Sequence, residues 1–196
     1  MSDVTHNTYP DWLSSTLASD ATDGRGVLHC GLHSLNANGR VIGPAFVVLA
    51  SQDDNQVIRR IVATPPPSGF VLVVGGHQTS HTATIGGLMA LELQNLGFLG
   101  VITEGLVRDS GEIRELAMPV WCRGVTPVAS AKVNPGVIGD PIIIGSTLIH
   151  EGDLVIADDD GIVIWEKDDI AQLLIKAKEK LDSDNVRLER LLAATK

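Results

Sequence analysis

The stretch that decides the fold is residues 70–109, FVLVVGGHQTSHTATIGGLMALELQNLGFLGVITEGLVRD. It opens with an apolar strand pattern at residues 70–74, passes through a polar stretch at residues 77–82, and then repeats apolar residues at helical spacing over residues 83–96. A second apolar strand pattern follows at residues 100–103. Because strands that are apolar on both faces belong in buried parallel pairs, this order predicts a right-handed βαβ crossover and an α/β fold.

Different patterns flank this unit. Upstream, residues 11–21 predict a short helix, and residues 40–50 predict a strand interrupted at Gly43-Pro44, because proline lacks a backbone donor. Downstream, short β-rich pieces predict antiparallel or mixed sheet at residues 120–123, 141–144, 153–156 and 161–165, with a hairpin turn at Asp159-Asp160-Gly161. Residues 168–194 predict a long helix that either packs on the body or reaches a neighbouring subunit.

Composition limits the possible partners. The chain has 196 residues, enough for one domain with a continuous core, and a net charge of −9 without any stripe of Lys and Arg, which argues against direct nucleic-acid binding. Residues 1–12 contain no apolar signal segment, and no run approaches the roughly 20 apolar residues that span a bilayer. Cys30 and Cys122 lack metal-ligand spacing, which suits free thiols in a reducing compartment. We therefore expect a cytoplasmic protein that is not attached to a membrane.

Charged residues follow the second apolar strand. Glu104, Arg108 and Asp109 come just past its carboxyl end, where sites of such βαβ units lie. A carboxylate there can hold Mg²⁺, and the guanidinium offers paired donors to a carboxylate or an oxyanion. An Arg-Asp pair in a loop is, however, more often a structural salt bridge, so the pattern needs support from its surroundings.

The support comes from the glycines at the helix start. A helix that begins near Gly86-Gly87 presents unpaired N–H groups at its first turn, and its dipole favours an anion there. Glycines also allow a ligand to approach the backbone closely. The alternative is a helix start packed tightly on a strand, and spacing alone does not separate the two interpretations.

Two other patterns invite a metal-binding interpretation. His77 and His81 are four residues apart and could share a helix face, but no third ligand is near in sequence, so a substrate or proton-relay role suits them better. The acidic run at residues 158–160 lacks the ligand spacing of a calcium loop, which favours a solvated hairpin turn.

Several motifs, in their order and spacing, resemble one known family. They are Gly39-Arg40-Val41-Ile42-Gly43-Pro44-Ala45-Phe46, Val73-Val74-Gly75-Gly76, Gly97-Phe98-Leu99-Gly100-Val101-Ile102, Gly105-Leu106-Val107-Arg108-Asp109 and the segment Gly152 to Gly161. From about Leu17 to Trp165 the chain resembles the RraA-like proteins, which include the 4-hydroxy-4-methyl-2-oxoglutarate aldolases. The resemblance implies a single layered α/β domain over residues 1–196 of the swivelling β/β/α type, with a core at about 17–166, a C-terminal helix at about 168–194, and assembly as a homotrimer or hexamer.

The resemblance also implies a lyase. In the aldolase branch, a class II (metal-dependent) aldolase cleaves a 4-hydroxy-2-oxo diacid to pyruvate and a second oxo acid, with oxaloacetate decarboxylase activity alongside. Asp109 would bind the divalent metal, Mg²⁺ or Mn²⁺, and Arg108 would donate to the 2-oxo group. The substrate carboxylate would be held by the backbone N–H groups of Gly86, Gly87, Leu88 and Met89.

One position departs from the aldolase pattern. Where the aldolases commonly carry an acidic residue, this chain has Gly87, so the acid–base group would come from Glu104, His77 or His81. The alternative function is that of a non-catalytic RraA-type regulator, which binds and inhibits an RNA-degrading enzyme. That branch lacks the Asp after the Arg, so Asp109 favours the enzyme.

Overall fold

The computed structural model describes residues 9–194; the segment 1–8, part of the region expected to carry no signal segment, lies outside the described residues. Its main sheet has the strand order β1-β7-β5-β3-β2-β12-β13, with β9 paired to the end of β2. These strands are β1 (His33–Ser34), β2 (Val41–Leu49), β3 (Val71–Gly75), β5 (Gly100–Thr103), β7 (Val120–Cys122), β9 (Val137–Ile138), β12 (Leu154–Ala157) and β13 (Ile162–Trp165). The predicted mixed α/β class is confirmed.

The centre of the sheet is parallel. β2, β3, β5 and β7 run in the same direction, while β12, β13 and β9 are antiparallel to their neighbours. Helix α3 (Gly87–Asn95) lies between β3 and β5 in the chain and these strands are parallel, so the predicted βαβ order is confirmed. Every residue of β3 and β5 is buried, which explains why both segments are apolar without alternation.

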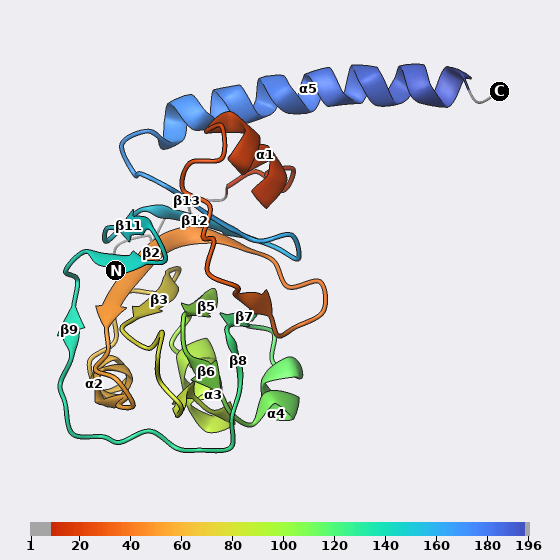
Figure 1. Cartoon of the computed structure of the whole chain (residues 1–196). Helices are drawn as coiled ribbons and strands as arrows, with labels where there is room; N and C mark the ends of the chain where they lie inside the picture. The colour runs from red at the N-terminus through yellow and green to blue at the C-terminus, as the bar shows by residue number, and fades with distance from the viewer. Residues whose placement is uncertain (1–8, 195–196) are drawn as a thin grey trace.

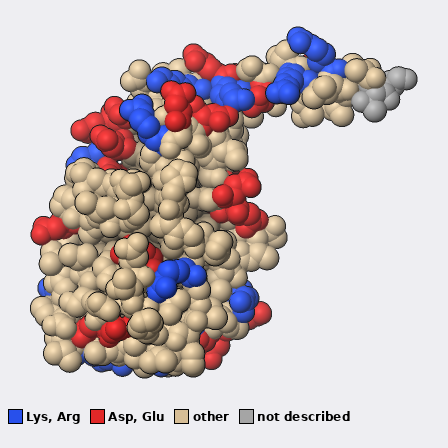
Figure 2. Space-filling model, viewed as in Figure 1, with Lys and Arg blue, Asp and Glu red and all other residues tan. Residues whose placement is uncertain are grey.

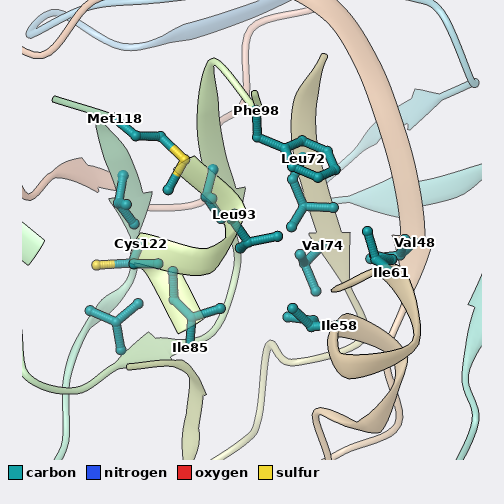
Figure 3. Close-up of a cluster of buried hydrophobic side chains, with 14 of the residues drawn as sticks. Val48, Ile58, Ile61, Leu72, Val74, Ile85, Leu93, Phe98, Met118 and Cys122 are labelled. Atoms are coloured by element: carbon teal, nitrogen blue, oxygen red, sulfur yellow. The ribbon is translucent and has the colours of Figure 1, made fainter. Parts of the chain in front are cut away.

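Layers cover both faces of the sheet (Figure 1). Helices α2 (Gln56–Ala63), α3 and α4 (Ser110–Arg114) cover one face, and the hairpin of β10 (Ile142–Ile144) and β11 (Thr147–Ile149) covers the other. On the helical side, Ile58, Ile61 and Leu93 pack with Leu72 and Val74 (Figure 3). The alternate residues of the same strands face the hairpin. This is the expected β/β/α layering.

The predicted interruption at Gly43-Pro44 is wrong, because β2 continues from Val41 to Leu49. The backbone N–H of Ala45 donates to Asp153 O at 2.8 Å, on the β12 side. Since successive N–H groups alternate between the two sides of a strand, residue 44 faces the β3 side. Pairing with β3 begins only at Ala45 with Val71, so the missing donor of Pro44 disrupts no ladder bond.

The predicted helix over residues 83–96 begins too early. Residues 83–85 are strand β4 (Ala83–Ile85), which pairs with β6 (Leu106–Val107), and β6 pairs with β8 (Gly124–Val125) in a small parallel sheet. β4 is fully buried, and its backbone forms hydrogen bonds with segments that are not helical: Ala83 N–H donates to Val128 O at 2.9 Å. Tertiary pairing therefore overrides the helical spacing of its apolar residues.

The C-terminal helix is confirmed as α5 (Ile170–Ala194). Its first half packs on α1 (Ser15–Ala21) and the β12–β13 pair, burying Leu173 and Ala177. The second half projects from the body (Figure 1), and charges of both signs are interleaved along the helix (Figure 2). None of the helices within residues 9–194 is long and apolar enough to cross a membrane.

Two smaller expectations from the sequence are confirmed, the hairpin turn and the free cysteines. The turn at residues 159–161 joins β12 to β13, and the Asp158 carboxylate accepts from the N–H groups of Ser15 at 2.7 Å and Asp160 at 3.1 Å, a structural role. Cys30 and Cys122 are both free, and burial raises the pKa of each thiol. Burial therefore disfavours the thiolate form of both cysteines.

Gly76, which follows β3, gives a test of the fold. Its φ is +90°, and a Cβ added there would lie 2.0 Å from Ala50 O. We expect Gly76→Ala to lower the free energy of unfolding by about 2–4 kcal/mol, because left-handed strain and a backbone clash add together. The matched control is Gly139→Ala, where φ is +85° but nothing lies within 4 Å, so about 1 kcal/mol is expected in urea unfolding. Equal losses in the two variants would contradict this placement of Gly76.

Candidate functional site

The site is built by pairs of consecutive strands. β3, β5 and β7 of the main sheet are each followed in the chain by a strand of the small sheet, β4, β6 and β8. The parallel pairing of β4 and β6 aligns Ile85 with Val107, and Arg108 N–H donates to Ile85 O at 3.0 Å. Gly86 and Arg108, the next residues of the two strands, therefore emerge side by side. This pairing joins the two segments that the sequence singles out.

Asp109 connects these segments directly. Its Oδ2 accepts from Gly87 N–H at 3.1 Å and lies 3.5 Å from Arg108 Nε, and both charged side chains are 41% exposed. A Cβ on Gly86 would lie 2.7 Å from Asp109 Oδ2 and 2.8 Å from Arg108 Nε. A side chain at residue 86 would therefore displace the Asp109 and Arg108 side chains from this close approach. The helix start and the Arg-Asp pair form one unit.

A cavity of about 290 Å³ opens over this unit. It is lined by Asn55, Arg59, Ala83, Gly86, Leu88, Met89, Glu92, Arg108, Asp109, Ala129, Ser130 and Lys132. Five of the predicted site residues line the cavity: Gly86, Leu88, Met89, Arg108 and Asp109. Gly87 does not line it but donates a hydrogen bond to Asp109, which does. Three of the lining side chains are cationic and two are carboxylates, which suits a small anionic ligand.

Asn55 is a site residue that sequence reasoning missed. Its Nδ2 donates to Thr84 O at 2.9 Å, while its buried Oδ1 has no hydrogen-bond partner among the residues that the structure describes. A buried acceptor without a partner is costly, so a ligand donor such as a hydroxyl would find a ready acceptor here. An Asn beside a short helix carries no sequence signal for this role.

Its neighbour Asp54 holds the far wall of the cavity. The buried Asp54 carboxylate accepts from the backbone N–H groups of Gln56, Val133 and Asn134 at 2.8–3.0 Å. Burial raises the pKa of this carboxyl, but the three donors outweigh burial and leave its pKa below the ordinary value. The ionised group therefore fastens the segment that carries Lys132 to the start of α2.

Glu104 lies elsewhere. It is buried, its Oε1 accepts from Gly76 N–H at 2.6 Å, and its backbone oxygen accepts from Arg123 Nε at 3.3 Å. It is not among the residues that line the cavity. The structure therefore brings together Arg108 and Asp109 but places Glu104 behind them, as a link between the ends of β3 and β5.

The two histidines also lie outside the cavity. His77 is fully buried, with Nδ1 2.6 Å from Thr84 Oγ1 and Nε2 2.9 Å from Ser51 O. Because a carbonyl only accepts, Nε2 carries the proton. His81 is exposed, and its backbone N–H donates to Asp53 Oδ1 at 2.8 Å. His77 thus supports β4 from inside the fold, and His81 belongs to the surface loop before it.

The donor set fits one kind of metal site. Within residues 9–194, no group of three or more His, Cys, Asp or Glu side chains could enclose an ion. Mg²⁺ needs no such cage, because it is commonly held by one or two carboxylates and keeps waters and substrate oxygens as its other ligands. The half-exposed Asp109 carboxylate at the cavity fits that mode, and the set does not fit an enclosed structural zinc.

Comparison with known sequences is consistent with this geometry. Residues 15–164 match the sequence model of the RraA-like family, described as Aldolase/RraA. A Halalkalibacterium halodurans protein named as a candidate 4-hydroxy-4-methyl-2-oxoglutarate aldolase is 33% identical over 175 residues, which are 89% of this chain and 83% of that protein. An Arabidopsis thaliana protein named as a candidate aldolase of the same kind is 37% identical over 122 residues, covering 62% of this chain and 72% of its own.

Comparison with solved structures finds the same fold. RraAS2 from Streptomyces coelicolor, described as an unusual member of the RNase ES inhibitor RraA protein family, has a TM-score of 0.81 at 26% identity. The match covers 91% of this chain and 93% of that one. Proteins of this fold are thus named both as aldolases and as inhibitors. The family match over three quarters of the residues and the shared architecture show that this chain belongs to the RraA-like family.

Proposed function

We propose that this protein is a divalent-metal-dependent lyase that cleaves a 4-hydroxy-2-oxo diacid to pyruvate and a second oxo acid, with oxaloacetate decarboxylation as a related activity. The observation that carries the proposal is the meeting of Arg108 and Asp109 with the start of α3 in one cavity. The aldolase names of two relatives support it.

The start of α3 provides a place for the substrate carboxylate. The first turn of any helix leaves backbone N–H groups outside the helical ladder, and the first ladder bond here runs from Ala90 N–H to Gly86 O at 2.9 Å. Leu88 and Met89 line the cavity at that turn, where the helix dipole favours an anion. Arg59 and Lys132 line the same cavity and suit the second carboxylate of a diacid.

Cleavage of the bond between C3 and C4 leaves an enolate on the pyruvate half. Arg108 would donate to the 2-oxo oxygen, where the negative charge develops. Asp109 would hold Mg²⁺ or Mn²⁺, which when bound supplies Lewis-acid stabilisation of that charge. Loss of CO₂ from oxaloacetate leaves the same enolate, so one arrangement serves both reactions.

Arg108→Ala tests the oxyanion role. We expect pyruvate release from 4-hydroxy-4-methyl-2-oxoglutarate and from oxaloacetate, measured with Mg²⁺ and a coupled dehydrogenase, to fall by about a hundredfold or more, because a donor to the developing charge is lost. Arg114→Ala is the matched control, since Arg114 is an exposed arginine of α4 outside the cavity. Wild-type rates in Arg108→Ala would contradict the assignment.

Asp109→Asn tests the metal site. Asn keeps the shape of the side chain and tolerates the left-handed backbone at this residue, whose φ is +55°. We expect Mn²⁺ affinity, measured by electron paramagnetic resonance, to fall about tenfold or more, together with the loss of metal-dependent turnover. Asp23→Asn, at a residue of the same φ in an exposed turn, should leave both unchanged. Unaltered Mn²⁺ binding in Asp109→Asn would rule out this ligand.

The similarity to RraAS2 favours one other candidate function, a regulator that binds and inhibits an RNA-degrading enzyme. A folded, metal-loaded chain that inhibits such an enzyme and releases no pyruvate from either substrate would support the regulator. Assembly as a homotrimer or hexamer is likewise proposed from the resemblance, and sedimentation equilibrium measures it.

A further inference from the structure

The space beside Gly87 is filled by a carboxylate from another helix. A Cβ added to Gly87 would lie 2.1 Å from Glu112 Oε2, 3.0 Å from its Cδ and 3.1 Å from its Cβ. A Cβ only 2.1 Å from Glu112 Oε2 is too close, so a side chain at residue 87 would require the Glu112 carboxylate to move away from this place. Gly87 is not among the residues with positive φ, so its backbone conformation does not require glycine. A side chain at residue 87 would instead displace the Glu112 carboxylate from its present position.

The first turn of α4 fixes where Glu112 stands. This turn closes with the bond from Ile113 N–H to Asp109 O at 3.1 Å, and the side chain of Ile113 is fully buried in the core under α3. Glu112 is exposed, and its carboxylate has neither a hydrogen bond nor an ion pair with any residue that the structure describes, while its backbone oxygen accepts from Glu115 N–H at 3.1 Å. Its carboxylate therefore lies at the start of α3 without neutralisation by a neighbouring cation.

Retro-aldol cleavage needs such a group. The hydroxyl on C4 must lose its proton as the C3–C4 bond breaks, and a positioned base speeds that transfer. Arg108 is always protonated, and the proposed function commits Asp109 to the metal. The buried Glu104 and His77, two of the candidates from the sequence, are held by hydrogen bonds away from the cavity. Among the nearby carboxylates this leaves Glu92, which lines the cavity, and Glu112, which lies outside that lining but beside Gly87 at the start of α3.

We infer that Glu112 is the proton acceptor of this site and takes the place of the side chain that residue 87 lacks; the inference rests on the proposed function. The Glu112 carboxylate takes the proton of the C4 hydroxyl, and C4 becomes the carbonyl carbon of the departing oxo acid. The electrons of the broken C3–C4 bond pass to the enolate of the pyruvate half. Protonated Glu112 then returns its proton to C3, which gives pyruvate and regenerates the carboxylate.

Glu92 is the weaker candidate because of its position. It follows Leu88 by four residues on α3 and therefore stands a full helical turn, about 6 Å, beyond the first turn where the substrate carboxylate would bind. Glu112, in contrast, lies against Gly87 itself.

Comparing two reactions of the same site shows whether Glu112 acts as a proton acceptor or only as a structural residue. Oxaloacetate has no hydroxyl on the bond that breaks, so its decarboxylation needs no proton acceptor at that step. We expect Glu112→Gln to lower cleavage of 4-hydroxy-4-methyl-2-oxoglutarate by about a hundredfold and to leave oxaloacetate decarboxylation within a few fold. Pyruvate affinity, measured by calorimetry with Mg²⁺ present, should stay unchanged. Glu115→Gln, at an exposed residue at the end of α4, is the matched control for both reactions.

A double-variant cycle tests the contact itself, first through stability and then through turnover. Gly87→Asp should lower the melting temperature of the metal-free protein when Glu112 is present and should be tolerated in the Glu112→Ala background, where the space is open. The double variant Gly87→Asp, Glu112→Ala should also recover aldol cleavage relative to Glu112→Ala alone. Equal destabilisation by Gly87→Asp in both backgrounds would overturn the placement of Glu112.

The outcomes distinguish the two levels of the proposal. A wild-type chain that releases pyruvate from neither substrate overturns the proposed function, and the inference with it. Equal losses of both reactions in Glu112→Gln, or no loss, overturn the inference alone. A selective loss of cleavage in Glu92→Gln, with Glu112→Gln unaffected, transfers the role to Glu92.

Discussion

The parallel pairing of β4 with β6 is the constraint on which the site depends. The two strands are short, yet their register brings Ile85 level with Val107 and thus sets Gly86 beside Arg108. Ile85 and Val107 are both fully buried in the core under α3, so a slip of one residue would turn buried side chains outward. The hydrophobic core therefore holds the register, and the register positions the charged groups.

Polar groups support this pairing from below. The buried His77 ring joins Thr84 of β4 to the backbone at Ser51, and Thr84 Oγ1 lies 3.2 Å from Thr103 Oγ1 at the end of β5. A Cβ on Gly105 would lie 2.2 Å from Thr84 Oγ1, so glycine is required where the chain leaves β5 for β6. Such a network is stable only when each buried member has partners, which gives His77 a structural role.

The larger elements could be predicted from sequence because their signals are local. β3 and β5 are uninterrupted apolar runs, and α5 is long enough to show its periodicity. The small sheet could not be predicted from sequence. Its strand β6 spans only two residues, and the apolar residues of β4 continue the helical spacing of the apolar residues in α3. The residues of the site fall into the same two groups. Those next to predicted elements, Gly86 to Met89 and Arg108-Asp109, could be predicted from the sequence. The residues from α2 and from the segment after β8 could not, because only tertiary packing brings them to the cavity.

The short helix α4, with five residues, helps to position two carboxylates near the start of α3. The left-handed backbone of Asp109 turns the chain sharply after β6, so that the next turn returns toward α3. Asp109 and Glu112 are therefore set by one turn, which the buried Ile113 anchors. A side chain at residue 87 would displace the Glu112 carboxylate from the start of α3. On the inference drawn above, the carboxylate at the start of α3 comes from this turn and not from residue 87, while the paired strands position Arg108 and Asp109 independently of it.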